Sequence, residues 1–169
     1  MHGSWDWLGR GGVWVLLAAL AAGPSFAAEM SFAERLAQAE ALVNQDARAA
    51  EVEARAILAG AEAVGDTAAI GTAQRVLGRS LNVRGDNEAA LAAFQAALAS
   101  LPPDASVDRA LLLRHMGVVY FDLAQRDLAL SHYLQALAIF EAAAATEEVA
   151  KTRANIANVH YINGDLERA

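Results

Sequence analysis

Small and large apolar residues recur at fixed spacings along residues 31–169, in stretches separated by short polar turns. Gly78 corresponds to Gly117 and then to Ala157, at spacings of 39 and 40 residues. Small residues at fixed points allow helices to pack closely, and the large residues between them fill the gaps, so each copy predicts a pair of helices. The predicted helices span residues 32–44, 47–63, 67–84, 87–100, 105–124, 128–144, 147–162 and from 166 onward.

Turn and capping residues agree with these ranges. Gly85 and Gly164 suit left-handed helix ends, and Ser31 with Glu34 predicts a capping box. Pro102-Pro103 ends the fourth predicted helix, because proline cannot lie inside one. The predicted N-caps are Asp86, Asp127 and Asp165 for second helices of a pair, and Asp66, Asp104 and Thr146 for first helices.

The repeated pattern resembles the tetratricopeptide repeat (TPR) family, in a variant whose 39–40-residue period exceeds the usual 34 or so. The units span about 31–70, 71–109, 110–149 and 150–169, the last one truncated. The resemblance implies an all-α fold, an α-solenoid of antiparallel helix pairs (a TPR-like superhelix), and protein or peptide binding in a concave groove. The matching residues are Leu77, Gly78, Leu81, Gly85, Ala90, Phe94, Ala97 and Pro102, then Met116, Gly117, Tyr120, Ala124, Ala129, Tyr133 and Ala136, then Ile156, Ala157, His160, Gly164 and Ala169.

Residues 1–27 differ from the rest and have the order of a secretory signal peptide. Arg10 precedes an apolar run at Val13–Ala22, and the small residues Ser25 and Ala27 occupy the −3 and −1 positions of a cleavage site before Ala28. The run is shorter than the roughly 20 residues that span a bilayer. We therefore expect export to the periplasmic or extracellular side of a bacterial inner membrane, with an uncleaved signal anchor as the alternative.

The composition argues against several classes of function. The net charge of −7 argues against a nucleic-acid partner, because such proteins need excess cations. The chain has no cysteine, which excludes disulfides and cysteine-ligated metal sites, and its 42 alanines favour helix. No phosphate-binding glycine turn and no nucleophile-and-base motif is present, and no histidine pair has the i, i+3 or i+4 spacing of a helical metal site. We expect no enzyme activity, cofactor or metal.

The helix positions that line the groove in the TPR family are rich in cations and amides here. Guanidinium groups bind carboxylates through paired hydrogen bonds, so we expect a protein or peptide partner with an acidic or carboxylate-ended segment. The alternative is that the arginines cover apolar surface and pair with nearby acids of the chain itself. The predicted partner-binding residues are Arg35, Arg75, Arg79, Asn82, Arg114, His115, Lys151, Asn155, Asn158 and Tyr161.

Two functions remain open at this level. The first is an exported, non-catalytic TPR adaptor or scaffold. The second is the N-terminal sensory region of a longer membrane signalling protein, such as a diguanylate cyclase or histidine kinase, because the last repeat is half complete at Ala169. In that case a downstream segment would hold the chain to the membrane.

Overall fold

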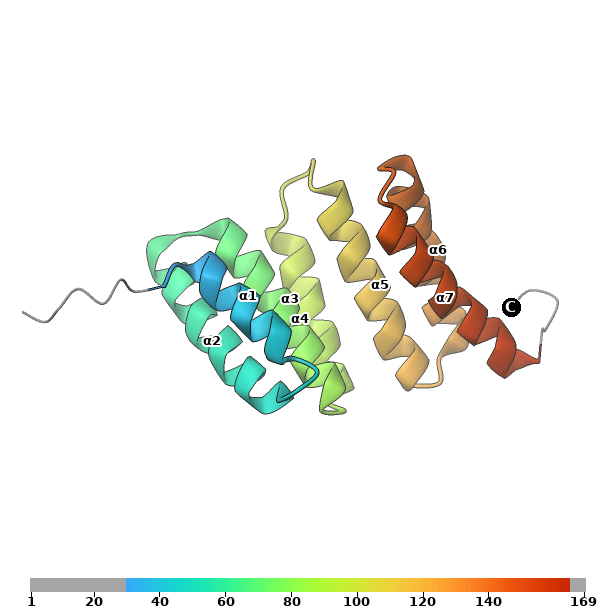
Figure 1. Ribbon diagram of the computed structural model, residues 1–169, viewed down its shortest axis with the longest axis horizontal. Helices are drawn as coiled ribbons and strands as arrows, with labels where there is room; N and C mark the ends of the chain where they lie inside the picture. Colours follow the sequence, from blue (N-terminus) through green and yellow to red (C-terminus); the bar gives the residue numbers. More distant parts are fainter. Residues whose placement is uncertain (1–29, 165–169) are drawn as a thin grey trace, which may run out of the picture. The chain divides into compact units, whose positions relative to one another are not determined.

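Residues 30–164 are described by a computed structural model, and they form α-helices and no strand. The predicted signal peptide, the Asp165 cap and the helix from 166 onward lie outside these residues. The fold class expected from the sequence is confirmed: successive helices pack against one another as in an all-α solenoid (Figure 1). The helices are α1 (Phe32–Leu42), α2 (Ala47–Val64), α3 (Thr67–Val83), α4 (Asn87–Ser100), α5 (Ser106–Asp122), α6 (Arg126–Ala142) and α7 (Thr146–Asn163).

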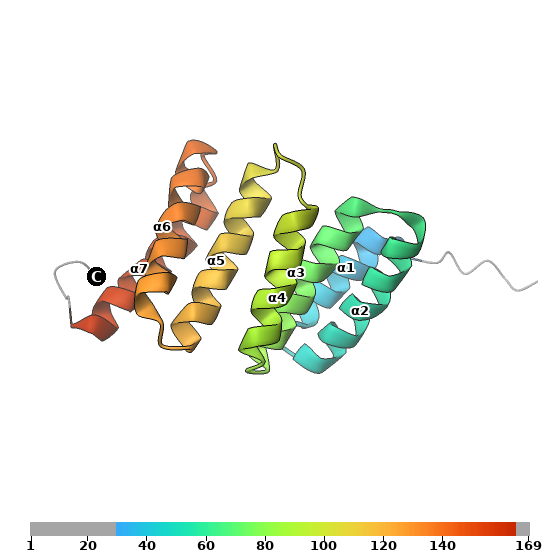
Figure 2. The same ribbon diagram turned by 180° about the vertical axis from the view of Figure 1, so that it is seen from behind.

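The helices form two layers. Helix α1 contacts α3, α3 contacts α5, and α5 contacts α7, and we call these four helices the inner layer. Helices α2, α4 and α6 pack on the inner helices without such contacts among themselves, and we call them the outer layer. Figure 1 views the molecule with α1 and α7 in front, and Figure 2 shows α2, α4 and α6 from the other side.

The core runs between the layers and depends on close approach of helices. A Cβ atom added at Gly78 would lie 2.6 Å from Cε1 of Phe94, and one added at Gly117 would lie 2.6 Å from Cε1 of Tyr133. Each ring therefore packs directly on the backbone of the partner helix, in the second and third pairs alike. The alanines at the repeated positions are fully buried beside these rings, namely Ala90, Ala97, Ala129 and Ala136.

The first pair also places a glycine opposite a ring, but less closely. Its second helix has Ala54 where the later pairs have an aromatic residue. The aromatic side chain comes from the first helix instead, because the ring of Phe32 lies 3.1 Å from the Cβ position of Gly60 on α2. In the first pair the ring therefore belongs to the first helix and the glycine to the second, the reverse of the two later pairs.

The helix ends correct part of the capping prediction. Ser31 forms the expected capping box with Glu34, and Asp66 accepts a hydrogen bond from the backbone N–H of Ala69. Asp86 is an N-cap but its side chain makes no capping hydrogen bond. Three caps were wrong: Ala105, Gln125 and Ala145 occupy the N-cap positions predicted for Asp104, Asp127 and Thr146.

No helix within residues 30–164 is long and apolar enough to cross a membrane.

Candidate partner-binding site

All ten residues predicted to bind a partner lie on the inner layer. Arg35 belongs to α1; Arg75, Arg79 and Asn82 to α3; Arg114 and His115 to α5; and Lys151, Asn155, Asn158 and Tyr161 to α7. The structure joins several of them into two clusters of opposite charges, one between α1 and α3 and one between α5 and α7.

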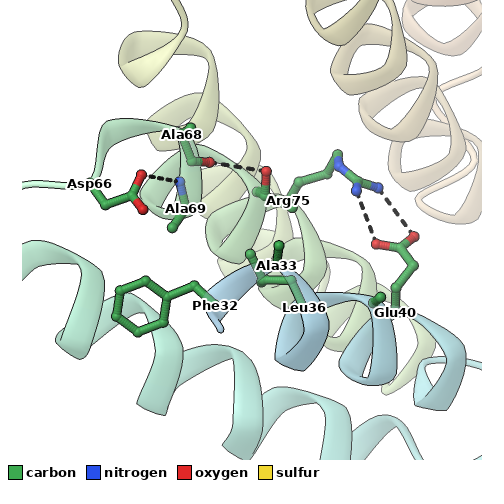
Figure 3. A pocket seen from close by; sticks show the side chains of 10 residues that line it. Phe32, Ala33, Leu36, Glu40, Asp66, Ala68, Ala69 and Arg75 are labelled. Carbon is green, nitrogen blue, oxygen red and sulfur yellow. Dashed lines mark hydrogen bonds and ion pairs between the residues drawn. The ribbon is translucent and has the colours of Figure 1, made fainter. Parts of the chain in front are cut away.

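The first cluster is centred on Glu40 of α1. Its carboxylate makes a two-pronged pair with Arg75, in which Nη1 lies 3.1 Å from Oε1 and Nη2 lies 3.0 Å from Oε2 (Figure 3). Nη1 of Arg79, one helical turn further along α3, donates to the same Oε1. The three side chains are 22–30% exposed, so the cluster is half-buried but open to solvent.

The second cluster is centred on Glu148 of α7. Its Oε2 lies 3.0 Å from Nη2 of Arg114 on α5, and its Oε1 accepts a hydrogen bond of 2.9 Å from Nζ of Lys151. Lys151 also pairs with the exposed Glu147 at 2.8 Å. The arrangement repeats that of the first cluster, in which two cations share one carboxylate.

His115 lies among the cations of both clusters. Its ring stacks on Phe94 of α4, with the ring centres 5.7 Å apart. Burial lowers the pKa of His115 well below its ordinary value, and the charges of Arg114, Arg79, Arg75 and Lys151 act in the same direction. His115 is therefore uncharged at neutral pH, and the two clusters lie close enough to act on one ring.

The arginines of α3 are also affected by burial. Desolvation lowers the pKa of Arg75, while Asp108 and Glu148 act against that change. Desolvation lowers the pKa of Arg79, and repulsion from Arg114 adds to it. Both side chains keep their charge, because the ordinary pKa of arginine lies so far above neutrality.

The other predicted residues have separate partners or positions. Nε of Arg35 lies 2.6 Å from Oε1 of Glu53 on α2. Nδ2 of Asn82 donates to Asp122 of α5 at 2.7 Å and to Asn87 at 3.0 Å. Asn155 is partly buried, whereas Asn158 and Tyr161 are exposed along α7. Pairing of the inner-layer arginines with acids of the chain, the alternative drawn from the sequence, is thus present in the structure.

Two hollows, which the sequence did not predict, lie on either side of the first half of α3. The hollow between α1 and α3 measures about 370 Å³, and Phe32, Leu36, Glu40 and Arg75 contribute to its wall (Figure 3). The hollow between α3 and α5 measures about 230 Å³ and is lined by Leu101, Pro102, Asp108 and Leu112 among others. Three residues of α3 line both hollows, namely Ala68, Thr72 and Arg75.

The hollows exist because the start of α3 carries small side chains. Ala68, Gly71 and Thr72 follow the i, i+3, i+4 spacing of one helix face, so no large side chain fills the space beside them. This spacing of small residues is the feature of the sequence from which the hollows could have been predicted. Arg75, one turn further on, places a cation between the two largely apolar spaces. Acidic side chains line both of them as well, Glu40 and Asp66 in the first and Asp108 in the second.

Within residues 30–164, no group of three or more histidine, aspartate and glutamate side chains is arranged to hold a metal ion. No protein-family model matches the chain, and no curated protein matches it.

Proposed function

We propose that the chain is a non-catalytic protein-interaction module of the TPR type, whose inner layer binds an extended, acidic segment of a partner protein or peptide. The observation that carries the proposal is the position of Arg75 between two hollows with apolar walls. Apolar spaces with a few fixed polar groups are the usual form of a recognition site. The signal-peptide order of residues 1–27 supports a function outside the cytoplasm.

The TPR assignment is supported by packing as well as by sequence pattern. Gly78 against Phe94 and Gly117 against Tyr133 give two successive helix pairs the same close contact. An inner layer built from equivalent helices offers a continuous surface for an extended chain, as stacked repeats commonly do.

Charge reversal of the inner arginines tests the function. A fluorescein-labelled peptide of Leu, Ala and Asp is titrated with wild-type protein and with the Arg75→Glu/Arg114→Glu variant, and binding is measured by fluorescence polarisation. We expect affinity to fall by about tenfold or more, because hydrogen bonds to charged groups contribute roughly 1.5–3 kcal/mol each. Circular dichroism melting of both proteins shows whether the fold survives the two changes.

Arg55→Glu is the matched control. Arg55 lies on the outer helix α2, is 56% exposed, and also loses an ion pair, with Glu51 at 2.9 Å, when its charge is reversed. It should bind the peptide as wild type does. Equal affinity of wild type and the folded double variant would contradict the proposed function.

A further inference from the structure

The carboxylate of Glu40 occupies the place in the α1/α3 hollow that an acidic ligand would take. Glu40 lines this hollow together with Arg75, and it holds both guanidinium groups of α3 that face α1. Figure 3 shows its side chain reaching toward Arg75 beside Leu36. An acidic side chain that enters the hollow meets an arginine that is already engaged.

Two cations share one carboxylate at this cluster. Arg75 and Arg79 contribute two positive charges, and Glu40 contributes one negative charge, so the cluster keeps a net charge of +1. Asp108 and Glu148 also act on Arg75. Asp108 is exposed, so solvent screens its effect, and Glu148 is itself paired with Arg114 and Lys151. Of the residues that line the hollow, Arg75 is the one cation, and Glu40 and Asp66 are the acids. The hollow therefore combines an apolar wall with an arginine that Glu40 already holds.

Exchange of one carboxylate for another at this cluster would keep Arg75 in an ion pair. The side chains of Glu40, Arg75 and Arg79 are 22–30% exposed, so a ligand carboxylate can reach the cluster from solvent. Glu40 can therefore leave Arg75 when a ligand carboxylate arrives, while Arg79 still pairs with it. The apolar wall at Phe32 and Leu36 then adds burial of the ligand's aliphatic groups.

We infer that Glu40 is a built-in competitor for the partner's carboxylate, and that the α1/α3 hollow selects an extended peptide bearing an acidic side chain next to an aliphatic one. The inference rests on the proposed function, because it names the ligand chemistry of the same surface. It distinguishes Glu40 from a purely structural ion-pair residue, whose removal would not improve binding.

Neutralising Glu40 tests this inference. With the labelled Leu/Ala/Asp peptide, Glu40→Gln should bind about two- to tenfold more tightly than wild type, since removal of the competitor frees both guanidinium groups. The twin peptide with Asn in place of every Asp should show no such gain. Glu40→Asp keeps the charge but shortens the side chain, so it should give an intermediate gain in affinity. This variant replaces Glu40→Gln in the test if Glu40→Gln does not fold.

Glu53→Gln is the matched control, because it removes the same charge from the chain. Glu53 pairs with Arg35 between α1 and α2, at 2.6 Å, and does not line the hollow. Equal gains in Glu53→Gln and Glu40→Gln would overturn the inference in favour of a general charge effect. Weaker or unchanged binding by folded Glu40 variants would overturn it too.

The failures of the two proposals are distinguishable. If wild type binds the Asp peptide through Arg75 and Arg114 but Glu40→Gln brings no gain, only the inference about Glu40 fails. If neither wild type nor the Glu40 variants bind either peptide, the proposed function fails with it.

Discussion

At the residue scale, the ends of several helices depend on a backbone conformation that favours glycine. Gly85 has a φ of 82°, and the N–H groups of Gly85 and Asp86 donate to the carbonyls of Asn82 and Leu81 at 2.8 Å. These two bonds form a Schellman motif, which satisfies carbonyls that the helix leaves open. The left-handed conformations predicted for Gly85 and Gly164 are confirmed.

Alanine takes the same conformation at two other helix ends. Ala124 after α5 has a φ of 58°, and Ala144 after α6 has a φ of 53°. The same pair of backbone hydrogen bonds is present at both ends. After α5, the N–H groups of Ala124 and Gln125 donate to Phe121 and Tyr120, and after α6 those of Ala144 and Ala145 donate to Glu141 and Phe140. Each Cβ opposes this conformation, and the cost is about 1–2 kcal/mol. The sequence offered no sign of these two turns beyond their place in the repeat.

Replacing Ala124 by glycine should therefore stabilise the protein. Relief of the left-handed strain of about 1–2 kcal/mol exceeds the 0.4–1 kcal/mol or so that glycine adds to the entropy of the unfolded chain. We expect a net gain of up to about 1 kcal/mol in the free energy of unfolding, measured by urea denaturation. Ala138→Gly, inside α6, is the control and should destabilise. A loss of stability in Ala124→Gly would contradict the argument.

At the element scale, the order of the seven helices within residues 30–164 follows from the sequence, while exact helix starts do not. The predicted helices 67–84 and 87–100 agree with α3 and α4 within one residue. The helix predicted at 128–144 begins at Arg126 and ends at Ala142 instead. The reason is that Gln125 follows the left-handed Ala124 directly and already has the N-cap position, so Asp127 falls in the first turn.

Close packing within a helix pair gives a second stability prediction. Gly78→Ala would place a methyl group 2.6 Å from the ring of Phe94, which is 1% exposed and enclosed by the core. Overpacking of this kind costs about 1–3 kcal/mol, so the melting temperature should fall. In a chain that also has Phe94→Leu, Gly78→Ala should lower the melting temperature less than it does in the wild-type chain. The comparison is between the double variant and the Phe94→Leu single variant.

Gly71→Ala is the control for that prediction. Gly71 is also buried in α3, but its nearest neighbour, Cβ of Ser100, would lie 3.9 Å from the added methyl group. The substitution should be neutral or stabilising, because alanine favours helix over glycine by up to about 1 kcal/mol. Equal losses for Gly71→Ala and Gly78→Ala would show that the ring contact is not the cause.

At the scale of the whole molecule, ion pairs tie one helix pair to the next. Arg75 and Glu40 are 35 residues apart, and Arg79 and Glu40 are 39 apart, so these contacts span about one repeat. Asn82 and Asp122 do the same across 40 residues between α3 and α5. The inner layer thus uses the same polar groups to hold its helices and, in our proposals, to bind a partner.

The position of His115 predicts how stability depends on pH. The unfolded chain binds a proton at His115 below about pH 6.5, whereas the folded protein, with its lowered pKa, does not. Stability from this residue is therefore present above that pH and is lost as the pH falls, by up to about 1.4 kcal/mol per pH unit. Urea unfolding between about pH 7.5 and 5 measures the slope.

His115→Gln should flatten this dependence. The carboxylates whose pKa values are lowered, those of Glu34, Glu51 and Glu147, titrate below this window, since their ordinary value is 4.5. An unchanged slope in the folded variant would mean that His115 is not the group that titrates.

The sequence by itself determined the all-α class, the order of the helices and the repeated small and aromatic positions. These properties follow from periodic spacing along one chain, which local geometry converts directly into helix faces. It also determined that the predicted cations share the inner layer, because equivalent repeat positions fall on equivalent helices.

Only the tertiary structure decided what those cations contact. The spacing of residues along the sequence does not show that Glu40 pairs with both Arg75 and Arg79. It also does not show that Glu148 pairs with Arg114 and Lys151. Such pairs depend on how far neighbouring helices are offset and where long side chains can turn. The hollows beside α3 have the same origin, since an unfilled space is a property of several helices together.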